Sequence, residues 1–262
     1  MNEKVMRTNR KWQTLLFAAI IIGVMVASAA ITEFDFVHGI ATLPAALTWI
    51  FSNLYITAES LERLPTILEK LLETILMSVA AATTGTVVAF FLSLMGSKTT
   101  GTSGVLGIFA RFVASLSRNI PVVAWALILL LSFGQNSMTG YLALFVGSAG
   151  FLTRAFIESI DEVSQNAVEA LRATGATYFQ IVFKAVLPQS LPQIMSWILF
   201  MIETNIRSAT LVGILTGTGI GYTFDLYYKT LNYNAVALVT FSIILAVILI
   251  ELMSNHIRKV IL

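Results

Sequence analysis

The residues best placed to do chemistry are Glu203 and Arg207, which stand four positions apart inside a long apolar run. At that spacing on a helix, the two side chains share a face and can neutralise each other. An arginine at the centre of a bilayer-spanning helix costs about 2.5–3.5 kcal/mol, so we expect Arg207 to face a protein interior or a wet cavity. The pair is therefore either a simple internal ion pair or part of a polar path through a membrane.

A path through the membrane would also use the polar residues that surround this pair. Asn205, Ser208 and Thr210 lie in the same run and would form a polar wall with Glu203 and Arg207 that suits an anion. A catalytic role is less well supported, because one carboxylate beside one guanidinium is poor material for acid–base work.

Other kinds of chemistry find little support in the composition. The chain has no cysteine, which excludes a disulfide framework, a thiolate metal site and a cysteine nucleophile. The two histidines, His38 and His256, are far apart and have no partner pattern, so we predict no metal site and no catalytic residue.

The glycines between residues 213 and 221 invite comparison with a phosphate-binding loop, but no strand pattern precedes them and no Lys-Ser/Thr follows. We expect Gly217, Gly219 and Gly221 to form a flexible or re-entrant turn at the outer mouth, because glycine tolerates positive φ and close helix approach. The chain has no Gly-x-x-x-x-Gly-Lys-Ser/Thr motif. We therefore expect neither a cofactor nor an ATPase site in this chain.

The elements that position these residues are predicted to be membrane-spanning helices. Of 262 residues, 57% are hydrophobic and 11% charged, whereas about a quarter are charged in a soluble domain. Several apolar runs are long enough to cross a hydrocarbon core of roughly 30 Å. The predicted fold class is an all-α integral membrane protein with about six spans: 14–31, 71–95, 120–133, 140–157, 191–211 and 233–253.

The charge distribution orients these spans. Most of the 16 basic residues fall on one side of the layout, so the positive-inside rule places both termini in the cytoplasm. Residues 104–118 lie on that side and predict an interfacial helix, with Arg111, Ser115 and Arg118 on one face. Its opposite face consists of Leu106, Phe109, Val113 and Leu116.

The first 70 residues are predicted to form a separate region, with one transmembrane helix and an external amphipathic segment. The first run ends near Ala27-Ser28-Ala29, which resembles a signal-peptide cleavage site, but its length favours an uncleaved helix. Residues 37–58 are apolar enough for a span, yet Pro44 and Trp49 suit an interface better. From Leu61 a leucine stripe predicts a helix against an apolar surface. Residues 71–262 form the predicted core.

The longest charged segment between the spans is the loop 158–188. Residues 158–174 favour a helix that ends at Gly175 on a left-handed residue. Phe179, Val182, Phe183 and Val186 then predict a short amphipathic helix that Pro188 terminates. This helix either packs on its own bundle or docks into a groove of a soluble partner.

This loop carries a resemblance to a known family. The run Glu169-Ala170-Leu171, followed by Gly175 and by Leu187-Pro188, resembles the EAA loop of permease subunits from binding-protein-dependent ATP-binding-cassette (ABC) importers. Leu171 stands where a second alanine is usual, and Ala185 where an isoleucine is usual. The residues that the resemblance assigns to ATPase coupling are Glu169, Ala170, Gly175, Phe179, Phe183, Leu187 and Pro188.

Further motifs are similar to the phosphonate-type subfamily of these permeases. They are the run 169–176, the run 186–189, Glu203-Thr-Asn-Ile-Arg-Ser-Ala-Thr210 and Gly217-Thr-Gly-Ile-Gly221, with one glycine fewer than usual. The resemblance implies a type I importer permease in a bacterial inner membrane, transporting a phosphonate or a related oxyanion such as phosphite or phosphate.

The resemblance also implies partners. A binding protein, periplasmic or lipid-anchored, delivers the cargo, and two ABC ATPase subunits carry ATP and Mg on the cytoplasmic side. One chain with one coupling loop implies a homodimer, surrounded by membrane lipid; no nucleic-acid partner is expected. The alternatives are the same machine with methionine, a quaternary amine or another small solute as cargo, a membrane-embedded enzyme, and a channel.

Overall fold

A computed structural model describes residues 3–101, 104–163 and 165–261, and these residues are almost entirely helical. The chain divides into two compact units, Met1–Leu54 and Tyr55–Leu262. The larger unit begins earlier than the predicted boundary at residue 71, because the leucine stripe from Leu61 continues into the first long helix of the core.

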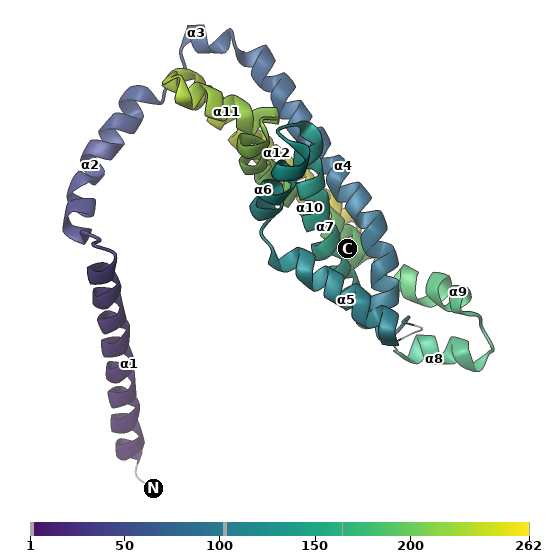
Figure 1. Ribbon diagram of the computed structural model, residues 1–262. Coiled ribbons are helices and arrows are strands. Elements are labelled where there is room, and N and C mark those ends of the chain that lie inside the picture. The colour runs from purple at the N-terminus through teal and green to yellow at the C-terminus, as the bar shows by residue number, and fades with distance from the viewer. Residues whose placement is uncertain (1–2, 102–103, 164, 262) are drawn as a thin grey trace. The chain divides into compact units, whose positions relative to one another are not determined.

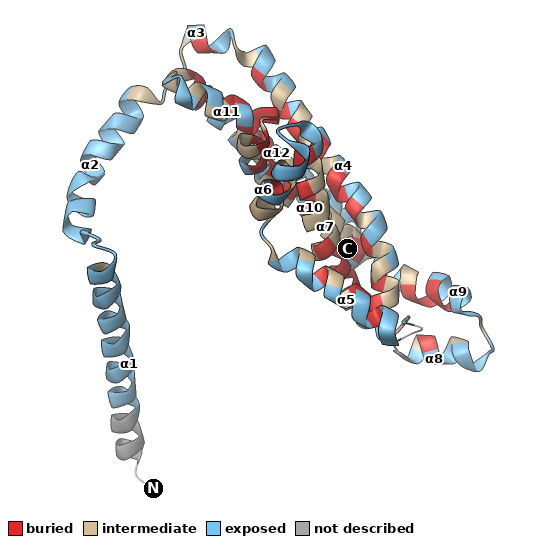
Figure 2. Cartoon of the chain, in the orientation of Figure 1, coloured by how far each residue is buried: buried red, intermediate tan, exposed pale blue. Residues whose placement is uncertain are grey.

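The smaller unit contains two helices, α1 (Glu3–Ile31) and α2 (Phe36–Asn53) (Figure 1). Within α1, Arg10–Ile31 is long and apolar enough to cross a membrane. The helix α2 starts where the Asp35 carboxylate accepts a hydrogen bond from the His38 N–H at 2.8 Å. None of its residues is buried (Figure 2), and it is not among the candidate spans of the described chain.

The larger unit is a helical bundle (Figure 1). Five helices of the described chain qualify as spans, and the count rises to six if a bent pair is taken as one, which confirms the predicted number. The elements of the larger unit are α3 (Ala58–Leu61), α4 (Leu64–Gly96), α5 (Gly104–Asn119), α6 (Val122–Phe133), α7 (Ser137–Asp161), α8 (Gln165–Ala173), α9 (Tyr178–Ile181), a π-helical turn (Val182–Val186), α10 (Leu187–Thr216), α11 (Gly219–Lys229) and α12 (Tyr233–Ile261).

The bent pair corrects the prediction of an independent third span at residues 120–133. Helix α6 has 12 residues, or about 18 Å, which is too short to cross a bilayer alone. It joins α5 at an angle of 93°. Pro121 lies at the break: it has no N–H to continue the α5 hydrogen bonds, and its backbone (φ −56°, ψ 143°) is extended just before α6 begins at Val122.

The centre of the bundle is a close crossing of α4, α7 and α10. A Cβ added to Gly85 of α4 would lie 2.9 Å from the Ser148 Cβ of α7, so the two backbones approach closely. The Asn205 amide of α10 donates to the Ser148 hydroxyl at 2.8 Å and to the Ser78 carbonyl at 3.4 Å. Asn205 is 1% exposed, so this buried amide links all three helices.

The glycine-rich stretch after α10, predicted as a flexible or re-entrant turn, forms the junction between two helices. Gly217 and Gly219 have φ values of +70° and +60°, and between them they end α10 and start α11. Gly221 lies inside α11, and a Cβ there would overlap the Thr210 carbonyl of α10. The Thr74 hydroxyl of α4 accepts from the Ile220 N–H at 2.8 Å. These glycines therefore permit a tight helix–helix contact.

This contact predicts that Gly221→Ala destabilises the protein by about 1–3 kcal/mol, because the added methyl must push α10 and α11 apart. The measurement is the thermal midpoint of the purified chain. Gly23→Ala is the control, since a Cβ at Gly23 in α1 meets nothing within 4 Å. Equal midpoints for the two variants would contradict the close contact.

Candidate functional site

The predicted coupling loop folds as two short helices joined at Gly175. Helix α7 ends at Asp161, so the helix predicted over 158–174 is interrupted; Ser164, in the interruption, lies outside the described residues. Helix α8 ends as predicted, with Gly175 at φ +77°. The Gly175 N–H donates to the Arg172 carbonyl at 3.0 Å and the Ala176 N–H to the Leu171 carbonyl at 3.1 Å. This is the bonding of a Schellman motif, which favours glycine.

The prediction that Pro188 terminates the next helix is wrong. The chain is helical from Tyr178 to Thr216, a length of 39 residues. A π-helical turn at Val182–Val186 precedes the proline, and the Leu187 N–H reaches back to the Val182 carbonyl. Pro188 then occupies the first turn of α10, where its missing N–H costs little.

The same turn separates the four residues that were predicted to share one apolar face. Val182 and Val186 are 2% and 1% exposed and pack in a cluster with Ile160. Phe179 and Phe183 are 70% and 59% exposed. In a turn with i→i+5 bonds, residues four apart stay aligned and residues three apart diverge. One side of the segment therefore packs on the bundle, and the other presents two aromatic rings.

The other predicted coupling residues lie along the same segment. Glu169 and Ala170 are exposed on α8, Leu187 is half-buried, and Pro188 is exposed. Glu169 lines a small cleft of about 160 Å³ together with Lys98 and Arg172. The structure thus connects α8 to the segment that follows α4.

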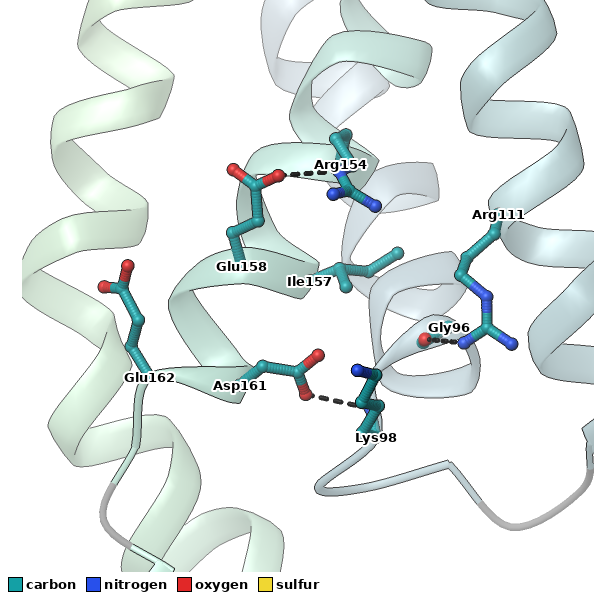
Figure 3. A pocket seen from close by; sticks show the side chains of 8 residues that line it. All are labelled: Gly96, Lys98, Arg111, Arg154, Ile157, Glu158, Asp161 and Glu162. Atoms are coloured by element: carbon teal, nitrogen blue, oxygen red, sulfur yellow. Dashed lines mark hydrogen bonds and ion pairs between the residues drawn. The ribbon is translucent and has the colours of Figure 1, made fainter.

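That connection depends on Asp161, which the sequence analysis missed. Its carboxylate accepts from the Ser97 hydroxyl at 2.6 Å, from the Lys98 N–H at 2.8 Å and from the Thr99 N–H at 3.2 Å. Figure 3 shows Asp161 at the end of α7, pointing toward Lys98. The Arg172 guanidinium adds a bond to the Thr99 carbonyl at 3.3 Å. A carboxylate at the end of a predicted span, facing a turn rich in Ser and Thr, was the available signal.

The predicted Glu203–Arg207 pair forms within α10 and gains a third member. Arg207 Nη2 lies 2.8 Å from Glu203 Oε1, and Arg258 Nη2 of α12 lies 3.5 Å from Glu203 Oε2. The Glu203 side chain is 9% exposed, whereas those of Arg207 and Arg258 are 48% and 24% exposed. Two guanidiniums therefore share one buried carboxylate, which leaves this cluster with one excess positive charge.

The remaining residues of the predicted polar wall are not gathered with this cluster. Asn205 is two positions from Glu203, about 200° around the helix, and holds α4 and α7 as described above. Ser208 and Thr210 are half-buried; the Thr210 hydroxyl donates to the Ile206 carbonyl at 3.4 Å. The structure thus brings together Glu203 and Arg207 and adds Arg258, which stands 55 positions away from Glu203 by residue number.

A comparison with protein families identifies the family of this chain. The sequence profile of the "binding-protein-dependent transport system inner membrane component" family matches residues 85–261, which is more than half of the chain. The chain belongs to this family. The predicted resemblance to importer permeases is thereby confirmed, as is the prediction of a multi-pass inner membrane protein.

Individual relatives agree with this assignment. The phosphite transport system permease protein PtxC of Stutzerimonas stutzeri is 30% identical over 72% of this chain and 69% of its own length. The phosphate-import permease protein PhnE of Mycolicibacterium smegmatis is 27% identical over 71% of this chain, but the match spans 35% of that protein. The methionine import permease MetP of Bacillus subtilis is 28% identical over 57% of this chain and 70% of its own length.

A solved structure shows the same fold. The inward-facing MetNI methionine ABC transporter has a chain that superposes with a TM-score of 0.67 at 22% identity, covering 75% of this chain and 96% of that chain. This likeness confirms the predicted permease fold.

The ion cluster predicts that Glu203→Gln destabilises the protein by about 1–3 kcal/mol, because two arginines lose their shared buried counter-charge. Thermal midpoints of the purified variants measure the effect. The control is Glu158→Gln, which breaks an exposed ion pair with Arg154 and should cost less than about 1 kcal/mol. Adding Arg258→Gln to Glu203→Gln should restore part of the loss; no restoration would mean that Arg258 is not coupled to Glu203.

Proposed function

We propose that this chain is the membrane-spanning permease subunit of an ATP-driven importer, and that its cargo is a small phosphorus oxyanion: a phosphonate, phosphite or phosphate. The observation that carries the proposal is the helix Tyr178–Thr216. It presents exposed aromatic rings at one end and an ion cluster with an excess positive charge along its length. It lies within the stretch that matches the family.

The exposed end of this helix suits a soluble ATPase subunit. Phe179 and Phe183 are large, apolar and exposed, and two such rings at the end of one helix can anchor it in a groove of a partner. The family membership supports an ATPase as the partner. ATP and Mg would be bound on that partner, so the chain itself is a transport component without its own ATPase site.

The ion cluster favours an anion as cargo. A positive charge that no neighbouring carboxylate balances is expensive at membrane depth, and a passing oxyanion would offset it. Guanidinium groups also match the geometry of phosphorus oxyanions. Methionine is the second candidate, because MetP and the MetNI fold are related to this chain, but the phosphite permease match extends over more of it.

Alternating access in a homodimer would complete the mechanism. When ATP closes the two ATPases, the segment 169–188 moves with them and the cavity between the two permeases opens toward a substrate-binding protein. Hydrolysis then resets the assembly. Coupling of this kind is reciprocal, so a loaded binding protein should also raise ATPase activity.

The docking role predicts that the double variant Phe179→Ala, Phe183→Ala loses most of its association with the ATPase while its insertion and thermal midpoint stay unchanged. Each exposed ring contributes to the interface and little to the fold. Co-purification of the ATPase with the tagged permease is the measurement. Phe51→Ala is the control, because Phe51 is 77% exposed but lies in α2. Undiminished co-purification of the double variant would reject the docking role.

The cargo prediction is tested with the chain reconstituted in vesicles with its ATPase and binding protein. Labelled phosphite or methylphosphonate should accumulate only with ATP, and unlabelled methionine should not compete. Accumulation of methionine instead would overturn the cargo but keep the importer. Uptake without the ATPase would favour a channel, and chemical conversion of the solute would favour a membrane enzyme.

A further inference from the structure

A second group of charges lies in a cleft between α5 and α7, outside the ion cluster and outside the docking segment, which is the stretch Tyr178–Val186 with its exposed phenylalanines. The cleft consists of two adjoining cavities of about 450 and 180 Å³. Figure 3 shows the larger one, with Arg111 reaching across from α5 toward α4, and Arg154 and Glu158 on α7. The smaller cavity is lined by Arg111, Ala114, Ser115, Arg118, Arg154 and Glu158.

The close packing of α5 on α7 creates this cleft. The buried side of α5 carries the small residues Gly107, Ala110 and Ala114. On α7, a Cβ at Gly150 would overlap the Ser117 side chain, so the two helices are in near contact. Arg111 and Arg118 follow on the adjacent face of α5, seven positions apart, and are thereby held beside Arg154.

The charges in the smaller cavity do not balance. Three arginines face one carboxylate, Glu158, which gives a formal charge of +2. Arg154 is paired with Glu158 at 2.6 Å, and Arg111 donates to the Gly96 carbonyl at 2.6 Å. Arg118 has no hydrogen-bond or ion-pair partner within the part of the chain that the structure describes. The larger cavity adds Lys98, Asp161 and Glu162, so the two cavities together carry a formal charge of +1; Asp161 already accepts hydrogen bonds from residues 97–99.

On the side of α5 away from its buried small residues, exposed apolar residues follow the arginines. Ile108, Phe112 and Leu116 are 63%, 62% and 48% exposed. Ile108 lies beside Arg111, three positions before it, and the row continues through Phe112 to Leu116 on the side of α5 away from α7. An arginine cleft bordered by exposed apolar residues at one end of a membrane bundle matches a phospholipid, with its phosphate among the guanidiniums and its acyl chain along the helix.

We propose that this cleft binds a phosphate-bearing anion, the headgroup of an anionic phospholipid, at the membrane face that the charge distribution predicts to be cytoplasmic. The proposal does not depend on the importer function. A free phosphorus oxyanion has the same binding chemistry without the acyl chain, and the two sources are separable by experiment.

The test uses the purified full-length chain in detergent. Native mass spectrometry should show phosphatidylglycerol retained in preference to phosphatidylcholine, and Arg118→Gln should reduce that retention about fivefold, since one surface cation contributes about 1 kcal/mol. Arg118→Lys should retain more than Arg118→Gln. Lys184→Gln is the matched control, because it removes an exposed cation from the docking segment and should leave retention unchanged.

A parallel measurement follows the thermal midpoint with added inorganic phosphate. If phosphate raises the midpoint of the wild type but not of Arg118→Gln, and phosphatidylglycerol shows no preference, the site is an anion site whose ligand is free phosphate. If Arg118→Gln changes neither lipid retention nor the response to phosphate, the proposal is overturned.

Discussion

The rest of the structure depends on one helical run, Tyr178–Thr216, that continues past two prolines, Pro188 and Pro192. Pro188 lacks the N–H that an α-helix needs and would crowd the carbonyl one turn earlier. The π-helical turn at Val182–Val186 precedes it, so the helix continues for 39 residues from Tyr178 to Thr216. At 1.5 Å per residue this is a rod of about 58 Å. This continuous helical run joins the exposed phenylalanines to the buried Glu203.

Different interactions hold this helix to the rest of the bundle at different points along its length. Val182 and Val186 hold its first turns to the bundle, and Asn205 joins it to α4 and α7. Glu203 links it to Arg258 of α12, and Gly221 lets α11 close against its far end. The interactions at the middle of the helix are polar, and those at its two ends are packing contacts. Polar pairs have discrete arrangements, which would suit the movement that we propose for this element.

Much of the fold follows from the sequence because the bilayer constrains it strongly: apolar runs long enough to cross must be helices. The Schellman end at Gly175 and the Glu203–Arg207 pair were predictable because they are local, at fixed spacing. What escaped prediction depends on distant partners or on subtle backbone geometry. Arg258 reaches Glu203 only when α10 and α12 are packed. The split between Phe179 and Val182 arises from a π turn that no residue type specifies. Asp161 shows its role only beside residues 97–99.

The account is tested most directly by locating the ATPase contact. Because the chain has no cysteine, Phe183→Cys introduces a single thiol at the exposed side of the rod, and Arg118→Cys a single thiol in the arginine cleft. The measurement is thiol cross-linking of each variant to a cysteine-bearing ATPase partner in membranes, with and without ATP. We predict that position 183 cross-links with high yield and that the yield changes with ATP. Cross-linking at position 118 but not at 183 would contradict the docking of the ATPase on this helix.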